Sequence, residues 1–390
     1  MIKKIKKFFV AIIVLLIFGT ILLFATGNEY IFKAGWLTYL QGKITANIDD
    51  YKDFDTRIIE TSATPQIWEY HENFNKIPLT NILKNKLDEL NSSGFLIVKD
   101  GKIITEKYFG NYADSSLTNS FSVAKTFTTM LLGKAIEDGY IKSLEQPITD
   151  FLPEYKDDSF AKTCTIGDLS SMTAGYNWNE EYYLPLNETT KSYYGKNLEN
   201  QLLKIDFNST SGERFEYKSG STGLLAIILT RATGQTLAEY LSKSFWKPLG
   251  MEASAPWALD NENGLEKAFC CVSARLRDFA KMGQLLLQNG KWKGKQLLDS
   301  TFIAKMTHPN TLNGKIKHPI YGYGTWTDYS YKPPFYSMVG FLGQRVICIP
   351  SENMIVVRTG NKCDKRNKKG VIPGVETYIW VDQALKMIKN

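Results

Sequence analysis

The feature that most constrains this chain is an uncharged apolar run near its N-terminus, from Phe8 to Ala25. As a helix, its eighteen residues would be about 27 Å long, close to the roughly 30 Å hydrocarbon core of a bilayer. Four lysines precede the run, a pattern that predicts an inside N-terminus and an exported remainder. A cleaved signal peptide is the competing interpretation, but its apolar region is usually shorter, about 7–15 residues, and ends in an Ala-x-Ala-like site. The sequence FATG at 24–27 fits that site poorly, so we favour a retained single-pass transmembrane anchor over 1–25, with the rest of the chain on the outer side of the cell membrane.

Composition excludes several classes of function. The formal charge is +7, and removing the four N-terminal lysines leaves +3, too little for nucleic-acid binding. Apolar residues make up 43% of the 390 residues, enough for a sizeable core. The five cysteines are an odd number without a CxxC pair, so neither a disulfide framework nor a zinc site is expected. The histidines are scattered and HExxH is absent, and we expect no metal and no cofactor.

Periodicity divides the rest of the chain into a lead-in segment over 26–92 and a domain over 93–390. Asp100-Gly101 between two apolar runs predicts a β-hairpin. Apolar spacing predicts helices over 122–138, 166–172, 221–233, 237–245, 274–288 and 375–388, with Ser273 as the N-cap of the fifth. Short β-rich runs predict strands over 321–327, 335–339, 344–349 and 354–358. The fold class is therefore α+β, an antiparallel sheet completed by both ends of the domain and flanked by helices, with a mostly helical lobe from the middle.

The residues most suited to chemistry begin with Ser122 and Lys125, which form an S-x-x-K motif. Residues i and i+3 share a helix face, so the hydroxyl and the amine converge. Serine needs a neighbouring base to act as a nucleophile, and a lysine among apolar neighbours is more easily deprotonated. The motif also occurs at Ser159/Lys162 and Ser244/Lys247, but only Ser122 opens a strongly periodic helix.

Two further elements complete a candidate site. Tyr217, in a loop that enters a helix, is followed by Lys218 and Ser219, and a buried phenol beside ammonium groups is a candidate general base. Gly343 and Gln344 begin a strand, where glycine lets the backbone approach a ligand and the next N–H is a candidate oxyanion donor. If these last two residues stood alone, an ordinary strand-entry turn would be the favoured interpretation.

Six blocks in order resemble the class C β-lactamase-related serine hydrolases, a family that includes penicillin-binding D,D-peptidases, esterases and 6-aminohexanoate-dimer hydrolases. The resemblance extends over roughly 95–358. It implies Ser122 as nucleophile, Lys125 and Tyr217 as proton carriers, Ser219 as the third member of the tyrosine motif, and the N–H groups of Ser122 and Gln344 as the oxyanion hole. The blocks are FSVAKTF, TIGDLSSMTAGYNW, FEYKSGSTGLLA, FWKPLGM, FCCVSARLRDFAKMGQLLL and VGFLGQ.

Two departures from the family pattern bear on the substrate. Phe341 stands where members usually carry a Lys or His that binds a substrate carboxylate, and phenyl cannot pair with a carboxylate. Ser273 stands where an asparagine is common in the 6-aminohexanoate-dimer hydrolase branch. Trp178, Tyr182 and Tyr183 are candidates to line the cleft, with core packing as an equal alternative, and the adjacent Cys270 and Cys271 are expected to be buried small apolar residues rather than nucleophiles.

The favoured function is a membrane-anchored, exported serine hydrolase that cleaves an amide or ester of a small molecule or peptide through an acyl-enzyme on Ser122. The alternatives are a non-catalytic protein that binds cell-wall peptides and a D,D-peptidase on the same scaffold. Phe341 motivates the binding protein and argues against the D,D-peptidase.

Overall fold

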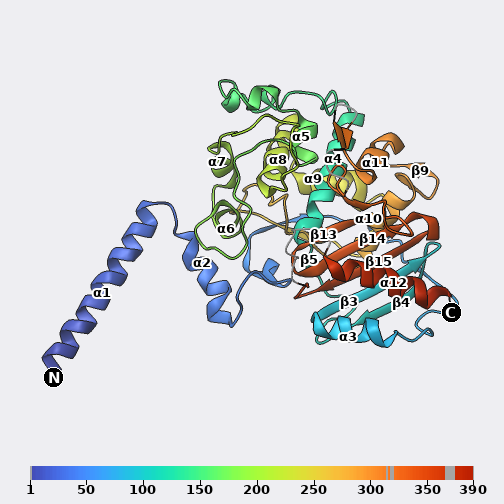
Figure 1. Ribbon diagram of the computed structural model, residues 1–390, viewed down its shortest axis with the longest axis horizontal. Coiled ribbons are helices and arrows are strands. Elements are labelled where there is room, and N and C mark those ends of the chain that lie inside the picture. The colour runs from blue at the N-terminus through green and yellow to red at the C-terminus, as the bar shows by residue number, and fades with distance from the viewer. Residues whose placement is uncertain (1, 313–314, 317–319, 365–373, 390) are drawn as a thin grey trace.

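The structure is a computed structural model that describes residues 2–312, 315–316, 320–364 and 374–389. Its first helix, α1 (Ile2–Ala25), projects away from the body of the molecule (Figure 1). Within the described ranges, α1 is the one helix long and apolar enough to cross a membrane, a test that a signal sequence also passes.

A seven-stranded sheet forms the core of the domain, in the order β12-β13-β14-β15-β3-β4-β2. The predicted hairpin is confirmed as β3 and β4, and the strands from the C-terminal part pair with β3, so both ends of the domain complete the sheet. Its pairs are antiparallel except β2 with β4. The strands are β2 (Glu69–Tyr70), β3 (Ser92–Lys99), β4 (Lys102–Tyr108), β12 (Trp326–Asp328), β13 (Phe335–Gly340), β14 (Gln344–Ile349) and β15 (Met354–Gly360).

The two faces of the sheet bury different layers because successive strand residues point to opposite sides. On β3, Phe95 and Ile97 pack in a cluster with α3 (Asn81–Glu89) and α12 (Val375–Lys389). Leu96 and Val98 belong to the larger cluster with α10 (Leu276–Leu287) and the helical lobe. The predicted α+β fold, a sheet flanked by helices, is confirmed.

The helical lobe comes from the middle of the chain and lies beside the sheet (Figure 1). Helix α4 crosses from the sheet into this lobe and packs against α8 and α9. The remaining helices are α4 (Ala124–Glu137), α5 (Ile166–Ser170), α6 (Glu188–Tyr194), α7 (Leu198–Leu203), α8 (Ser219–Thr233), α9 (Leu237–Leu241) and α11 (Ser300–Thr307).

Three predicted elements differ from the structure. Helix α10 begins at Leu276, and Ser273 is not its N-cap because it pairs with Asn119 in a two-stranded sheet. The helix predicted over 237–245 is α-helical only to Leu241 and continues as a π turn. The strand predicted over 321–327 is regular only from Trp326, because the chain between 321 and 326 folds back on itself through an isolated bridge.

The lead-in segment is built into the domain rather than hanging beside it. Helix α2 (Tyr30–Leu37) packs against α6, α3 covers the sheet, and β1 (Thr56–Ile59) pairs with β6 (Ala255–Ala258). The other short strands are β5 (Thr118–Asn119), β7 (Ser273–Ala274), β8 (Lys291–Trp292), β9 (Lys295–Gln296), β10 (Thr311–Leu312) and β11 (Lys315–Ile316).

Candidate active site

Ser122 lies in a single 3-10 turn, Phe121–Val123, at the entry to α4. The pairing of β5 with β7 holds the chain just before this turn, and the Phe121 N–H donates to Asn119 Oδ1 at 2.9 Å. Phe121 has φ of 44°, a left-handed conformation that is unusual for a bulky residue. Strain of this kind persists only where surrounding contacts enforce it, and here it presents the Ser122 side chain to two cavities.

Lys125 is the buried partner of Ser122. Its side chain lies one turn further along α4, and the residue is 2% exposed. Its Nζ donates to Ser122 Oγ at 2.8 Å and to the carbonyl oxygen of Phe269 at 2.9 Å. Burial lowers the pKa of Lys125 to about 8, against an opposing effect of Glu180. A substantial fraction of neutral amine therefore exists near neutral pH, and neutral amine can accept a proton from serine.

Tyr217 faces the same point from the loop before α8. Lys125 Nζ lies 5.0 Å from the centre of the Tyr217 ring, and Tyr217 and Ser122 line one cavity. The ring packs on Trp326 with centroids 5.3 Å apart. Lys218 was also expected to place its ammonium beside this phenol. Its Nζ instead pairs with Glu216 at 2.7 Å.

Ser219 is tied to an acid that the sequence did not single out, Glu180. The Ser219 hydroxyl donates to Glu180 Oε1 at 2.7 Å and its N–H donates to Oε2 at 2.6 Å. Trp178 Nε1 donates to the same carboxylate at 2.8 Å, and the Tyr182 hydroxyl donates to it as well. A carboxylate at the N-terminus of α8 is also favoured by the helix dipole. The sequence offered one signal for Glu180, which lies two residues after Trp178, the last residue of a block that resembles the family.

Gly343 and Gln344 do not line either of the cavities that meet at Ser122. Gly343 has φ of +86°, and a Cβ there would lie 2.4 Å from Arg358 Nη1, so glycine is needed for the turn and for the packing of Arg358. The Gln344 side chain is buried and bridges the backbones of Phe341 and Gly360. Both residues therefore shape the β13–β14 hairpin, and the expectation that Gly343 lets the backbone approach a ligand is not supported by its position.

The end of β13 lies directly against the turn that carries Ser122. A Cβ on Gly340 would be 2.3 Å from the carbonyl oxygen of Ser120, so only glycine allows this approach. Phe341 follows and stacks on Tyr182 with centroids 5.1 Å apart, and meets the Phe121 ring edge-on at 5.6 Å. Phe341 thus forms an aromatic wall beside Ser122.

Arg345 lines one of the cavities at Ser122, and its charge is paired with Glu376. Arg345 donates to Glu376 at 2.5 Å, to Thr377 at 3.0 Å and to the carbonyl oxygen of Gly340 at 3.0 Å. Its guanidinium is 4% exposed and supports the β13 backbone. Arg345 is therefore engaged in the fold and is not free to pair with a substrate carboxylate.

Cys270 and Cys271 are buried, as expected, but they form a disulfide between adjacent residues, which the sequence did not predict. Cys271 has φ of 77°, a left-handed conformation in the loop that carries Phe269. This loop places the Phe269 carbonyl on Lys125, so the disulfide lies next to the support of the candidate base.

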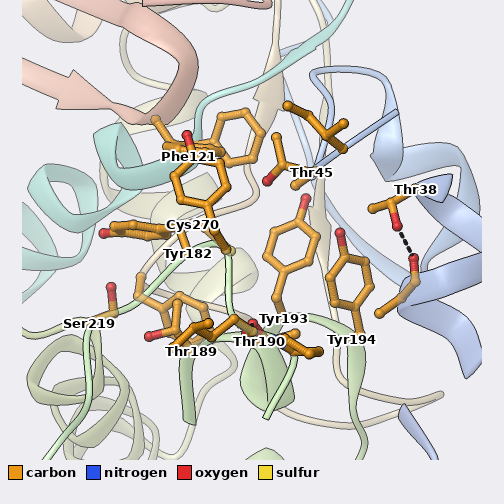
Figure 2. A pocket seen from close by; sticks show the side chains of 18 of the residues that line it. Thr38, Thr45, Phe121, Tyr182, Thr189, Thr190, Tyr193, Tyr194, Ser219 and Cys270 are labelled. Atoms are coloured by element: carbon orange, nitrogen blue, oxygen red, sulfur yellow. Dashed lines mark hydrogen bonds between the residues drawn. The ribbon is translucent and has the colours of Figure 1, made fainter. Parts of the chain in front are cut away.

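Two cavities meet at Ser122, and Phe341 lines both. The apolar cavity extends from Ser122 to α2 and α6 and includes Tyr182, Tyr183 and Cys270 (Figure 2). The polar cavity includes Tyr217 together with the acids Glu180, Glu181 and Glu376. Tyr182 and Tyr183 therefore line the cleft, whereas Trp178 is buried beneath it.

Other candidates lie apart from this site. The pairs Ser159/Lys162 and Ser244/Lys247 line neither cavity. Among the described residues, no group of three or more His, Cys, Asp and Glu side chains could hold a metal ion, and His318 lies outside those residues.

Comparisons with known proteins agree with this geometry. The family model described as Beta-lactamase matches residues 79–370. The 6-aminohexanoate-dimer hydrolase of Paenarthrobacter ureafaciens is 25% identical over 235 residues, which cover 57% of this chain and 59% of that relative. This chain therefore spans less than two thirds of that enzyme.

Solved structures share the fold over greater lengths. A candidate 6-aminohexanoate-dimer hydrolase from Bacillus anthracis superposes with a TM-score of 0.77 and 24% identity, covering 91% of this chain and 96% of that one. A penicillin-binding protein from Bacillus halodurans gives a TM-score of 0.60 and 18% identity, covering 77% and 99%.

Proposed function

The chain belongs to the Beta-lactamase family of serine hydrolases, and from that premise we propose that it is a membrane-anchored, exported hydrolase that cleaves an amide or ester through an acyl-enzyme on Ser122. The observation that carries the proposal is the contact of Lys125 Nζ with Ser122 Oγ at 2.8 Å. A serine hydroxyl in contact with an amine of lowered pKa is an activated nucleophile, because the amine can accept its proton.

In the proposed reaction, Ser122 Oγ attacks the substrate carbonyl while neutral Lys125 takes the hydroxyl proton. The new ammonium donates to the Phe269 carbonyl, and Tyr217, whose ring centre lies 5.0 Å from Lys125 Nζ, relays a proton from this ammonium to the leaving group. Collapse of the tetrahedral intermediate breaks the bond to the leaving amine or alcohol. Water then attacks the acyl-enzyme by the reverse proton path and releases the acid.

The oxyanion needs two N–H donors, and Ser122 at the entry to α4 supplies one. For the second we propose the backbone N–H of Phe341 in place of Gln344. Phe341 lines both cavities beside Ser122, whereas Gln344 lines neither. The close approach of Gly340 to Ser120 brings this part of β13 to the nucleophile.

Ser122→Ala tests the nucleophile. The variant should lose turnover of p-nitrophenyl acetate and labelling by a fluorophosphonate, and mass spectrometry of the wild type should place the label on Ser122. Ser159→Ala is the matched control, since Ser159 is an exposed serine with the same motif spacing, and it should keep both activities. Equal rates in wild type and Ser122→Ala would contradict the proposal and favour a non-catalytic binding protein.

The D,D-peptidase alternative is tested with the same preparations. It requires release of terminal D-alanine from a peptide ending in D-Ala-D-Ala, whose carboxylate would need a cation. Phe341 and the neutralised Arg345 provide none at this position. We expect ester turnover without D-alanine release, and release at a comparable rate would reverse the preference.

The anchor is proposed from α1 and the four lysines before the span. Full-length mass after expression in bacteria, resistance to carbonate extraction, and cleavage by protease added outside the cell would support it. A mature protein shorter by about 25 residues would show instead that the segment is a cleaved signal.

A further inference from the structure

The apolar cavity is open at Ser122 and extends toward the membrane-proximal part of the chain. Figure 2 shows Tyr193 and Tyr194 between the segment that carries Thr38 and Thr45 and the side of the site that carries Ser219. The cavity is open to solvent, so its empty space of about 790 Å³ includes the open mouth, and its lining runs from Ser122 to Ala34 of α2.

Three of the four threonines that line this cavity donate their hydroxyls to backbone carbonyl groups. Thr38 donates to the carbonyl of Ala34 at 2.6 Å, Thr190 to that of Leu184 at 2.7 Å, and Thr189 to that of Asn179 at 2.9 Å. These contacts turn the polar ends of the threonines toward the backbone. A ligand in the cavity therefore meets mainly methyl groups, aliphatic chains and aromatic rings, which favour a hydrocarbon over a peptide or sugar.

The rim of the cavity is apolar and exposed. Four residues both line it and are largely exposed, and we call them the apolar rim: Tyr39 (69%), Ile44 (76%), Tyr183 (61%) and Leu184 (57%). Helix α2 also exposes Phe32 and Trp36, and the 3-10 turn after it exposes Leu40. Exposed apolar patches of this kind mark sites that contact lipid or a hydrophobic ligand, and tryptophan and tyrosine are enriched at membrane interfaces.

The anchor brings this rim to the bilayer surface. Four residues separate the end of α1 at Ala25 from the start of α2 at Tyr30, so the two points lie within about 17 Å along the chain. The Phe24 ring of α1 stacks on Phe32 of α2 with centroids 6.0 Å apart. The cavity mouth is therefore held near the lipid that surrounds the anchor.

We infer that the apolar cavity binds the hydrocarbon chain of an acyl ester or acyl amide taken from the membrane, with its carbonyl at Ser122 and its polar leaving group in the polar cavity. This inference rests on the proposed function. Ser122 Oγ bonds to the acyl carbon, and the bond from that carbon to the leaving oxygen or nitrogen breaks. The leaving group departs with a proton, and water then releases the fatty acid and restores the Ser122 hydroxyl.

The test compares acyl chain lengths on the full-length protein in bilayer nanodiscs, using p-nitrophenyl acetate and p-nitrophenyl octanoate. Each methylene that enters an apolar site raises kcat/KM by up to about fourfold, so the wild type should prefer octanoate by at least about tenfold. Ala46→Phe places a ring in the cavity wall and should lower the octanoate-to-acetate ratio by at least about tenfold. Ala63→Phe, at an exposed position away from the cavity, should leave both rates unchanged.

A second variant guards against a folding defect in the first. Leu184→Asp changes only an exposed side chain of the apolar rim, so it should fold, and the charge should lower the same ratio. A wild type that hydrolyses both esters at equal kcat/KM, or a ratio that both variants leave unchanged, overturns the inference while the hydrolase stands. Failure to hydrolyse either ester, together with no fluorophosphonate label on Ser122, overturns the proposed function and this inference with it.

Discussion

Replacing Lys125 with methionine should inactivate the protein and change its stability in a way that depends on pH. Methionine has nearly the length of lysine and suits an apolar site. Loss of the proposed general base should lower kcat/KM for p-nitrophenyl acetate by about 10²–10⁴-fold. A lysine that only filled space would leave the rate within a small factor of the wild type.

The stability effect follows from the pKa of Lys125, which burial lowers from 10.5 to about 8. Each tenfold change in proton affinity is worth about 1.4 kcal/mol, so the charged lysine destabilises the fold by about 3 kcal/mol well below pH 8. Between about pH 8 and 10.5 the unfolded chain binds more protons than the folded one. Stability of the wild type therefore rises with pH across that window.

Methionine removes this destabilisation but leaves the Phe269 carbonyl without the lysine donor, which costs about 1–3 kcal/mol at any pH. The difference in free energy of unfolding, Lys125→Met minus wild type, should therefore be about 2 kcal/mol smaller at pH 9.5 than at pH 6. Urea unfolding in detergent, followed by tryptophan fluorescence, measures this difference. Lys162→Met, at an exposed position, is the control and should differ from wild type by less than about 0.5 kcal/mol at either pH. A Lys125→Met difference that does not change with pH would refute the reasoning.

Three further predictions concern the same site. The kcat/KM of the wild type should rise with pH to a plateau with a midpoint at about 8, since proton loss from Lys125 activates Ser122, and a flat profile from pH 6 to 9.5 would contradict this role. Gly340→Ala should lower kcat/KM by about 10²-fold, because its Cβ would lie 2.3 Å from the Ser120 carbonyl and displace β13; Gly35→Ala, with open space around its Cβ, should keep full activity. Alkylation of the denatured protein should modify Cys164, Cys348 and Cys363 without reductant and all five cysteines after reduction, whereas five before reduction would exclude the Cys270–Cys271 disulfide.

Local signals in the sequence were sufficient for most of the elements near the site. Asp100-Gly101 allows a tight turn between β3 and β4, and the apolar rhythm after Ser122 specifies α4, because these depend on neighbours within a few residues. The i, i+3 spacing likewise brought Ser122 and Lys125 into contact without help from the rest of the fold.

Contacts between distant segments could not be read in the same way. Ser273 looks like a helix cap, yet pairing with Asn119 makes it a strand residue. Gly343 looks like a ligand-facing glycine, yet its space is taken by Arg358. Glu180 gained its importance only when the fold placed Ser219 beside it. Each of these roles depends on a partner at least fifteen positions away along the chain, which no local pattern specifies.

By itself, then, the sequence determined the α+β class, the apolar N-terminal helix and the contact of Ser122 with Lys125, since each follows from hydrophobic periodicity or short spacing. Only the tertiary structure decided how charged Lys125 is, which backbone faces Ser122, and that an apolar cavity leads from it to α2. Desolvation and cavity shape are properties of surfaces that meet in space, and α2, α6 and β13 come together only when the chain has folded.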